Sequence, residues 1–474
     1  MPRSRWCARC WKRPGSRTGR NSSRAGRHDA HTAPPRAVRK TTMNPLYIES
    51  LDQEGRGIAR RDGKVVFVEG ALPGERAEIS VYRKKPAFEQ SFATRIFDES
   101  ASRTTPGCKF FGLCGGCSLQ HMDARTQVAA KQRVLEDNLR HIGKVQPEQM
   151  LPAIYGPSWG YRHRARLTVR HVFKKGGALV GFHEKRSSYV ADMSSCEVLP
   201  RRISDLLLPL RRLVDSLSLR ARLPQIELAL ADNADVLVLR NLDPLTAEDE
   251  DKLRVFADAH RVVFYLQPSG PETAALFYPT DTGALYYTLP EFDVRIHFRP
   301  TDFTQVNHAV NQVLVRRALK LLDPQPGERI ADLFCGLGNF TLPIARSGAQ
   351  VTGIEGSKGL INRAEENARS NDLSGNTRFL TMDLFKIDAE QWAALGLFDK
   401  LLIDPPRDGA MELIKLIGAD GPRRIVYVSC SPSTLARDAE VLVMVHGYKL
   451  RAAGVINMFP HTAHVESMAL FEKE

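Results

Sequence analysis

The chain contains no long hydrophobic run. No apolar stretch in its 474 residues approaches the roughly 20 residues that a membrane-spanning helix needs. The amino terminus also lacks the apolar core of a secretory signal peptide. We therefore expect a cytoplasmic protein without a membrane partner.

Cysteine is scarce: the chain has eight, too few for a scaffold stapled by disulfides. A reducing compartment is expected, in which thiols stay free for metal binding or catalysis. Three cysteines cluster as Cys108-x5-Cys114-x2-Cys117, and Cys196 follows at a distance. Four thiolates suit zinc or an iron–sulfur cluster, and their spacing alone does not decide between the two.

Net charge is almost absent from most of the chain. The whole sequence carries +13, but residues 1–42 hold twelve Lys and Arg and one acid, which leaves +2 for residues 43–474. Those first residues are rich in Arg, Ser, Gly and Pro without an apolar period, which predicts a disordered basic extension. Its composition resembles a transit peptide, but recognisable structure begins just after Met43, which favours a segment upstream of the true start. Cys7 and Cys10 form a lone pair there, so we expect no metal site.

The remaining sequence divides into three parts by its pattern. Short apolar runs between turn residues predict a small β-barrel in residues 43–100. Residues 101–298 mix strand and helix patterns and form a predicted central domain. From residue 328 strands and helices alternate and two strands end the chain, which predicts a doubly wound parallel sheet with an antiparallel edge in residues 299–474. The predicted fold class is thus multidomain α/β with a Rossmann-like carboxyl-terminal domain.

Individual elements can also be placed. Hydrophobic stripes predict helices over Asp123–Ile142 and Gln305–Leu322. Apolar runs of strand length predict the last five strands at residues 377–381, 398–404, 424–430, 449–456 and 464–472.

A glycine-rich turn follows the first strand of the carboxyl-terminal domain. It reads Phe334-Cys335-Gly336-Leu337-Gly338-Asn339, and the next strand ends at Glu355, 17 residues after the second glycine. Glycines let a ligand approach the backbone, and an acid at this position accepts hydrogen bonds from ribose hydroxyls. The turn lacks the third glycine of a pyrophosphate cradle, which favours a ligand without pyrophosphate, such as S-adenosylmethionine.

Two further strand ends carry chemistry. Asp404 follows an apolar strand and opens an Asp-Pro-Pro-Arg turn whose prolines aim the acid into the crevice. Cys430 ends another strand, and Ser431 and Pro432 after it predict a helix N-cap and first helical residue. A helix amino terminus beside the thiol predicts a thiolate-favouring site, although a buried structural cysteine is the commoner fate.

These motifs, taken in order, closely resemble those of the RNA uracil-5-methyltransferases. The resemblance covers about residues 46–474 and rests on Gln305-Val306-Asn307, the glycine-rich turn, the Asp-Pro-Pro-Arg turn, Ser429-Cys430 and Pro460-His461-Thr462-x-His464-Val465-Glu466. The barrel resembles a TRAM RNA-binding domain, and the clustered cysteines are similar to those of the family's ribosomal 23S RNA branch. The resemblance implies methyl transfer from S-adenosylmethionine to C5 of a uridine in 23S rRNA by a monomeric enzyme.

The resemblance also implies roles for individual residues. Cys430 would be the nucleophile that adds to C6 of uracil, and Glu466 would be the base that removes the C5 proton. The methyl-donor pocket would be lined by Gln305, Phe334, Asn339, Glu355, Asp383 and Asp404. A [4Fe–4S] cluster would be held by Cys108, Cys114, Cys117 and Cys196. Phe303 could stack on the target base, and a core position is equally compatible with the sequence.

The sequence leaves three other classes of protein to consider. A tRNA uracil-5-methyltransferase is disfavoured by the TRAM-like region and the cysteine cluster. A radical enzyme would need a C-x3-C-x2-C triad, which is absent. A non-enzymatic RNA-binding iron–sulfur protein would transfer no methyl group and would tolerate replacement of Cys430.

Overall fold

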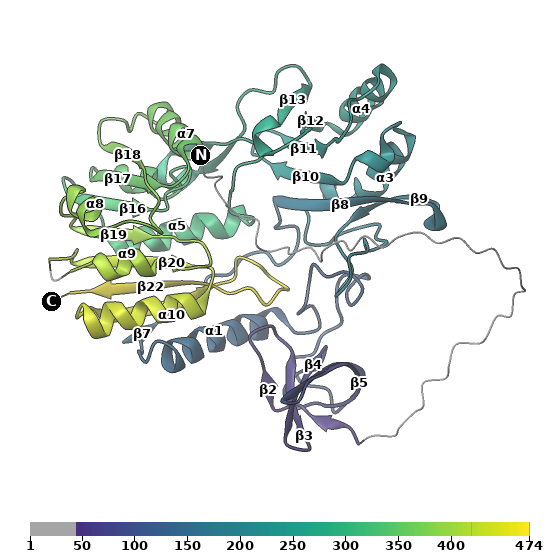
Figure 1. Cartoon of the computed structure of the whole chain (residues 1–474), viewed down its shortest axis with the longest axis horizontal. Coiled ribbons are helices and arrows are strands. Elements are labelled where there is room, and N and C mark those ends of the chain that lie inside the picture. The colour runs from purple at the N-terminus through teal and green to yellow at the C-terminus, as the bar shows by residue number, and fades with distance from the viewer. Residues whose placement is uncertain (1–43, 419, 474) are drawn as a thin grey trace, which may run out of the picture. The chain divides into compact units, whose positions relative to one another are not determined.

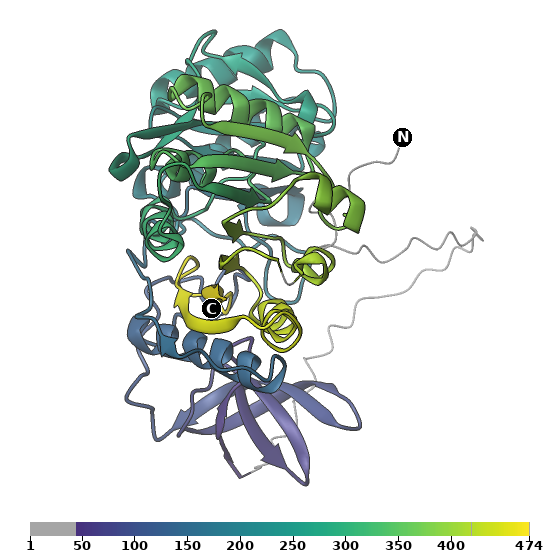
Figure 2. The same ribbon diagram turned by 90° about the vertical axis from the view of Figure 1, so that its left-hand side faces the viewer.

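The computed structural model describes residues 44–418 and 420–473 and is drawn in Figures 1 and 2. The predicted disordered extension over residues 1–42, with Cys7 and Cys10, lies outside the described residues. Pro45–Glu474 forms one compact unit. No helix in the two described stretches is both long and apolar enough to cross a membrane.

The amino-terminal part of this unit is a six-stranded sheet in the order β1-β5-β6-β4-β3-β2, coloured purple to blue in Figure 1. Its strands are β1 (Leu46–Tyr47), β2 (Ser50–Leu51), β3 (Gly57–Arg61), β4 (Lys64–Glu69), β5 (Arg76–Lys84) and β6 (Phe88–Phe97). The edge strands β1 and β2 are separated in sequence by Ile48 and Glu49, so one short segment pairs with β5 and then with β3. This segment closes the sheet into the small barrel that the sequence predicts.

A second six-stranded sheet follows, in the order β13-β12-β11-β10-β8-β9. Its strands are β8 (Arg164–Val172), β9 (Gly177–Gly181), β10 (Gln225–Leu230), β11 (Asp235–Arg240), β12 (Val263–Leu266) and β13 (Ala275–Tyr278). Its helices are α2 (Arg201–Ser204), α3 (Leu207–Ser216) and α4 (Ala247–His260). Buried leucines of α3 and α4, including Leu210 and Leu253, share one apolar cluster with Phe264 of β12.

The largest sheet has eight strands in the order β18-β17-β16-β19-β20-β22-β21-β7. They are β7 (Gln149–Met150), β16 (Arg329–Leu333), β17 (Gln350–Glu355), β18 (Thr377–Thr381), β19 (Lys400–Ile403), β20 (Arg424–Ser429), β21 (Lys449–Ile456) and β22 (Glu466–Glu472). The first five in this order are parallel, and β22 runs antiparallel to both neighbours. The predicted doubly wound sheet with an antiparallel edge is confirmed. The order reverses between β16 and β19, which opens a ligand crevice at the strands' carboxyl ends.

Helices cover both faces of this sheet (Figures 1 and 2). One face packs on α5 (His308–Leu322), α6 (Thr341–Ala345) and α7 (Lys358–Ser370), and the other on α1 (Ala124–His141), α8 (Ala389–Ala394), α9 (Met411–Leu416) and α10 (Pro432–Glu440). A hairpin of β14 (Tyr286–Leu289) and β15 (Val294–His297) joins the first face. Strand residues alternate between the two apolar clusters: Val426 and Val428 belong to one, and Ile425 and Tyr427 to the other.

The start of α1 agrees with the prediction, whereas α5 begins later than predicted. Asp123 caps α1 by accepting hydrogen bonds from Arg125 N–H and Thr126 N–H, as the predicted start requires. Helix α5 begins three residues later than predicted, because the Asn307 side chain accepts from Val310 N–H and acts as the N-cap. Gln305 is therefore in the loop before the helix rather than in its first turn.

Candidate active site

The strand register brings the predicted site residues to one edge of the large sheet. Leu333 pairs with Ile354 of β17 and with Ile403 of β19. The residues that follow these strand ends, Phe334 and Asp404, and the last residue of β17, Glu355, therefore meet at the carboxyl edge. This is the crevice where parallel α/β sheets bind ligands.

Glu355 lies beside the glycine-rich turn and is buried. Its Oε1 accepts a hydrogen bond of 3.0 Å from Ser357 N–H. Burial raises the pKa of the carboxyl, while N–H groups of Ser357, Gly336 and Gly356 act in the opposite direction. Gly336 and Gly338 have φ of 55° and 92°, values that favour glycine. The turn thus exposes backbone to a ligand while the acid is held in place.

Phe334 and Asp383, two of the predicted pocket residues, both contact Phe385. Phe334 is a non-glycine residue at φ 66°, and its ring lies 5.5 Å from the ring of Phe385. Asp383 is exposed beyond the end of β18, where its Oδ1 accepts from Phe385 N–H at 3.1 Å and its Oδ2 is 3.3 Å from Lys386 Nζ. Phe385 therefore links the two predicted pocket residues.

Asn339 is held by two partners that sequence reasoning missed. Its Oδ1 accepts from Tyr287 Oη at 2.9 Å and from Asn311 Nδ2 at 3.0 Å. Its own Nδ2 donates to Asn311 Oδ1 at 3.1 Å. Tyr287 belongs to β14 and Asn311 to α5, so no sequence motif connects them with the turn. Gln305 is half-buried in the loop before α5.

A second acid, Asp332, lies under the turn. It is fully buried, and its Oδ2 accepts from Thr341 Oγ1 at 2.5 Å. Burial and the nearby charges of Asp404 and Glu355 raise the pKa of Asp332 to about 7, although the hydrogen bond from Thr341 lowers it. Burial likewise raises the pKa of Asp404 to about 7. The crevice therefore holds acids whose pKa values are raised.

Cys430 and Glu466 lie at facing positions on neighbouring strand ends. Ser429 of β20 pairs with Ser467 of β22, so the next position in the antiparallel register sets Cys430 opposite Glu466. Ser467 Oγ donates to Ser429 O at 3.2 Å and fastens the two ends together. The predicted nucleophile and the predicted base are thus brought together by tertiary pairing across 36 residues of sequence.

Ser431 and Pro432 occupy the predicted N-cap and first helical positions of α10. Other groups around the thiol act against the thiolate. Burial, with the charges of Glu466 and Asp404, raises the pKa of Cys430 to about 12 despite the opposing charge of Arg407. Burial and the two carboxyl charges all disfavour the ionised sulfur.

Glu466 is 4 % exposed. Burial and the charge of Asp404 raise its pKa to about 8, and Arg407 opposes the shift. Arg407, from the Asp-Pro-Pro-Arg turn, also has its Nη2 at 3.2 Å from His464 Nδ1. Sequence reasoning assigned Arg407 no role, although its place beside Asp404 was a usable signal. The arginine is the cation that acts on both the nucleophile and the base.

The four predicted metal ligands are free thiols. Burial, with the charges of Cys117 and Cys114, raises the pKa of Cys196 to about 12. Burial also raises the pKa of Cys117 to about 11, with contributions from Cys114 and Cys108. The four thiols are therefore neighbours. Within residues 44–418 and 420–473, however, no group of three or more His, Cys, Asp or Glu side chains is arranged to hold a metal ion.

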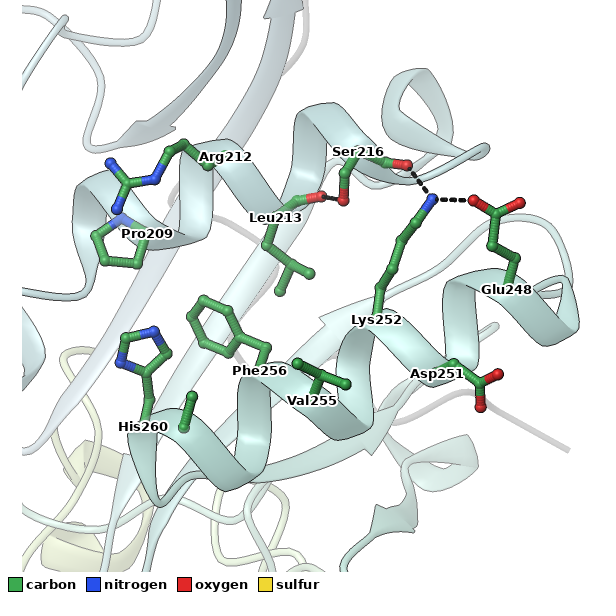
Figure 3. Close-up of a pocket in the computed structure, with 11 residues that line it drawn as sticks. Pro209, Arg212, Leu213, Ser216, Glu248, Asp251, Lys252, Val255, Phe256 and His260 are labelled. Atoms are coloured by element: carbon green, nitrogen blue, oxygen red, sulfur yellow. Dashed lines mark hydrogen bonds and ion pairs between the residues drawn. The ribbon is translucent and has the colours of Figure 1, made fainter.

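A groove of about 540 Å³ lies elsewhere, between α3 and α4 (Figure 3). Leu213 and Phe256 contribute to its apolar lining, and Lys252 Nζ bridges Ser216 O and Glu248 Oε1 at 2.8 and 2.7 Å. None of the predicted site residues lines it.

The fold and the site define a Rossmann-like methyltransferase domain that places a cysteine and a glutamate at its crevice. The family model for tRNA (Uracil-5-)-methyltransferase matches residues 124–474, and the TRAM domain model matches residues 45–88. The chain belongs to the tRNA (uracil-5-)-methyltransferase family, and it is a methyltransferase with an amino-terminal TRAM domain. The predicted family is confirmed.

Similar proteins cover nearly the whole chain. A 23S rRNA (uracil(1939)-C(5))-methyltransferase RlmD of Nitrosospira multiformis is 64% identical over 431 residues, which is 90% of this chain and 98% of that protein. The protein of the same name from Burkholderia thailandensis is 60% identical over 442 residues, 90% of this chain and 95% of that protein. The crystal structure of Pyrococcus abyssi tRNA (uracil-54, C5)-methyltransferase in complex with S-adenosyl-L-homocysteine has a TM-score of 0.69 and 23% identity, covering 91% of this chain and 100% of that one. That structure supports the fold.

Proposed function

We propose that this protein transfers a methyl group from S-adenosylmethionine to C5 of a uridine in 23S rRNA. The uridine would be of the uracil-1939 type named for the similar proteins. The observation that carries the proposal is the facing pair of Cys430 and Glu466 at the crevice. A nucleophile and a base on adjacent strand ends are what methylation of an unreactive pyrimidine carbon requires.

In this mechanism Cys430 acts first. Its thiolate sulfur bonds to C6 of the uracil ring, and the electron pair of the C5–C6 double bond moves toward C5 and O4. The ring becomes an enolate with carbanion character at C5, which takes the methyl group. Arg407 favours the thiolate, because its charge lowers the pKa of Cys430 against the burial that raises it.

Glu466 acts second. Its carboxylate takes the proton from C5, the double bond re-forms, and the sulfur–C6 bond breaks to release Cys430. A pKa raised to about 8 makes the carboxylate a stronger base than an exposed glutamate. Methylated uridine, S-adenosylhomocysteine and one proton result.

The methyl donor supplies a methyl group activated on a sulfonium sulfur. We propose that Glu355 accepts hydrogen bonds from its ribose, and that Phe334, Asn339, Asp383, Gln305 and Asp404 line the rest of the pocket. Glu355 and Phe334 support this because they flank the glycine-rich turn, where backbone and ligand can approach closely.

The target base must leave its stack or be unpaired for the sulfur to reach C6. Phe303 is 73 % exposed between the buried Asp302 and Thr304, so it projects into solvent rather than into the core. We propose that this ring stacks on an RNA base. The barrel, with the exposed Arg83, Lys84 and Lys85 at the end of β5, would contact the RNA backbone.

We also propose that Cys108, Cys114, Cys117 and Cys196 hold a [4Fe–4S] cluster. The soft donor set fits, because four sulfur ligands suit such a cluster and positive iron would offset the mutual repulsion of the thiolates. The methyl transfer moves no electrons, so this cluster would be structural. Iron and sulfide content of anaerobically purified protein, with its visible absorption spectrum, would test the assignment against zinc.

We also propose that the chain is divided into three domains. Residues 43–100 would be the TRAM barrel, 101–298 the cluster-bearing central domain and 299–474 the methyltransferase domain of a monomeric cytoplasmic enzyme. Residues 101–298 also contribute to the large sheet, because α1 packs on one of its faces and β7 pairs with β21 as its edge strand.

The deciding experiment incubates the protein with a labelled methyl donor and, in parallel, unmodified 23S rRNA or tRNA, and then maps the labelled base. Label at C5 of one 23S uridine is the expected result. Label in tRNA alone would favour the tRNA enzyme, and label in neither RNA would favour a non-enzymatic binder.

Two variants test the mechanism. Cys430→Ala should lose turnover and form no covalent RNA complex, whereas Glu466→Gln should trap an RNA–protein adduct that survives denaturing gels. Methylation by Cys430→Ala at the wild-type rate would rule out the covalent route.

A further inference from the structure

The loop that precedes Glu466 is unusually polar for a buried segment. It spans residues 457–465 between β21 and β22, and Asn457, His461 and Thr462 are all buried within it. His461 has φ of 65°, a left-handed conformation that a non-glycine residue adopts at a cost. Such a loop needs partners to keep its shape, and those partners set where β22 and Glu466 begin.

Gln127 of α1 supplies one set of contacts. Its Oε1 accepts from His461 N–H at 2.8 Å, and its Nε2 lies 3.2 Å from His461 Nδ1. The same Nε2 donates to Leu119 O at 3.1 Å and to Met122 O at 2.8 Å. One buried amide therefore joins the loop to the segment that leads from the cysteines into α1.

Lys131, one helical turn further along α1, supplies a second set. Its Nζ donates to Asn457 Oδ1 at 2.7 Å and to Phe459 O at 2.8 Å. The side chain is 2 % exposed, and burial lowers its pKa to about 7. Both acceptors are uncharged oxygens of the loop, so the position of this lysine is explained by the loop's shape rather than by an ion pair.

The cysteine segment completes the support. Ser118 N–H and Leu119 N–H, directly after Cys117, both donate to His461 O, at 2.9 and 3.0 Å. On the other side of the loop the Trp159 ring stacks on the His461 ring with centroids 3.9 Å apart. Residues more than 300 positions earlier in the chain thus hold the loop at Asn457, Phe459 and His461.

We propose that Gln127 and Lys131 are positioning residues for the base of the reaction, and that α1 and the segment after Cys117 serve as the template that aligns Glu466 with Cys430. This inference rests on the proposed function. It also gives the cysteine site a specific task, because any displacement of Cys117 is transmitted through Ser118 and Leu119 to His461.

The consequence is a selective defect. Cys430 lies between β20 and α10, and α10 packs on α1 through apolar side chains such as Leu135, which the substitutions at Gln127 and Lys131 leave in place. Addition to C6 and methyl transfer should therefore survive when the loop shifts. Removal of the C5 proton should slow, since a general base must lie within hydrogen-bond reach of the proton it takes. The covalent RNA–protein intermediate should then accumulate.

The test uses the full-length holoenzyme with 23S rRNA and compares Lys131→Met and Gln127→Met with Arg133→Met. Arg133 lies on the exposed side of the same helix, where it pairs with Asp137, and serves as a matched control for loss of a polar side chain. Single-turnover methyl transfer, the fraction of denaturation-resistant adduct and the release of methylated RNA are measured, with melting temperatures to confirm folding.

The expected result is release slowed at least about tenfold with accumulated adduct in the two buried-site variants, and wild-type behaviour in Arg133→Met. Release at the wild-type rate by either folded variant overturns the inference for that residue. Loss of adduct and product together in a folded variant overturns it as well, because the loop would then serve RNA binding or the nucleophile. If the wild-type protein itself methylates no RNA, the proposed function fails instead.

Discussion

Individual side chains in the crevice are governed by desolvation. Asp332, Asp404, Glu355 and Glu466 all have raised pKa values, and Cys430 follows the same direction. The resting site therefore favours neutral groups, and ionisation of each carboxyl raises the pKa of its neighbours. Arg407 provides the opposing positive charge, which explains why the turn after Asp404 needs a cation.

Glu466→Gln should make the protein more stable near neutral pH. The folded-state pKa is raised to about 8 from an ordinary value of 4.5, so the folded state binds more protons than the unfolded state between these values. The wild type therefore loses stability as pH rises through this window, and the Gln variant does not. The expected gain is about 3 kcal/mol near pH 7, vanishing below pH 4.5.

Urea unfolding of both proteins across this pH range is the measurement. Glu412→Gln, on the exposed side of α9, is the control and should leave the pH dependence unchanged. Equal stability of wild type and Glu466→Gln at every pH would mean that Glu466 is ionised at no cost in the fold.

At the scale of elements, the glycine-rich turn is secured by neighbours from outside its own βαβ unit. The hairpin strand β14 reaches it through Tyr287, and α5 reaches it through Asn311. These contacts fix the Asn339 side chain and with it the turn that approaches the methyl donor. The position of α5 is set in turn by its Asn307 cap.

Tyr287→Phe should weaken methyl-donor binding with little effect on the chemical step. The change removes the hydrogen bond of 2.9 Å to Asn339 Oδ1 and keeps the ring. A hydrogen bond worth about 1 kcal/mol corresponds to a KM for S-adenosylmethionine raised roughly fivefold. Tyr286→Phe on the same strand, where Arg295 stacks on the ring at 4.4 Å, is the control. A fall in kcat at unchanged KM would contradict the assignment.

Element types were largely predictable because they depend on local patterns. The period of apolar residues placed α1 within one residue at each end, and the last five strands were all found. The start of α5 was missed because a capping asparagine at residue 307 competed with an apparently continuous stripe. Strand β7 has two residues, too few for any periodic signal, and exists through pairing with β21.

At the scale of the whole molecule, an ion pair between the buried Glu75 and the partly buried Arg103 joins the barrel to the rest of the compact unit. Glu75, the residue before β5, accepts from Arg103 Nη2 at 2.7 Å, from Leu72 N–H at 2.7 Å and from Ser100 N–H at 3.1 Å. Burial alone would raise the pKa of Glu75, but these donors lower it. Arg103 also donates to Gly70 O at 2.8 Å, so one guanidinium links the barrel to the segment that leads to the cysteines.

Glu75→Gln should destabilise the protein by about 2 kcal/mol at neutral pH, because Arg103, whose side chain is 16 % exposed, then loses its charged hydrogen-bond acceptor. The pKa of Glu75 is lower in the folded state than in the unfolded state, so the ionised carboxylate stabilises the fold at pH above the unfolded-state pKa. This stabilisation is lost as the pH falls through the folded-state pKa. Unfolding at neutral and acid pH, with the exposed Glu78→Gln as control, measures the difference. An equal effect of both substitutions would argue against the ion pair.

The sequence by itself determined the kinds of elements and the motifs that indicate the family. These features follow from local periodicity, turn chemistry and short spacings. The tertiary structure alone decided that Cys430 faces Glu466, that its thiol pKa is raised instead of lowered, and that Gln127 and Lys131 hold the loop before the base. The physical reason is that burial, strand pairing and the sum of nearby charges depend on segments from tens to hundreds of residues apart, and no local pattern encodes which of them meet.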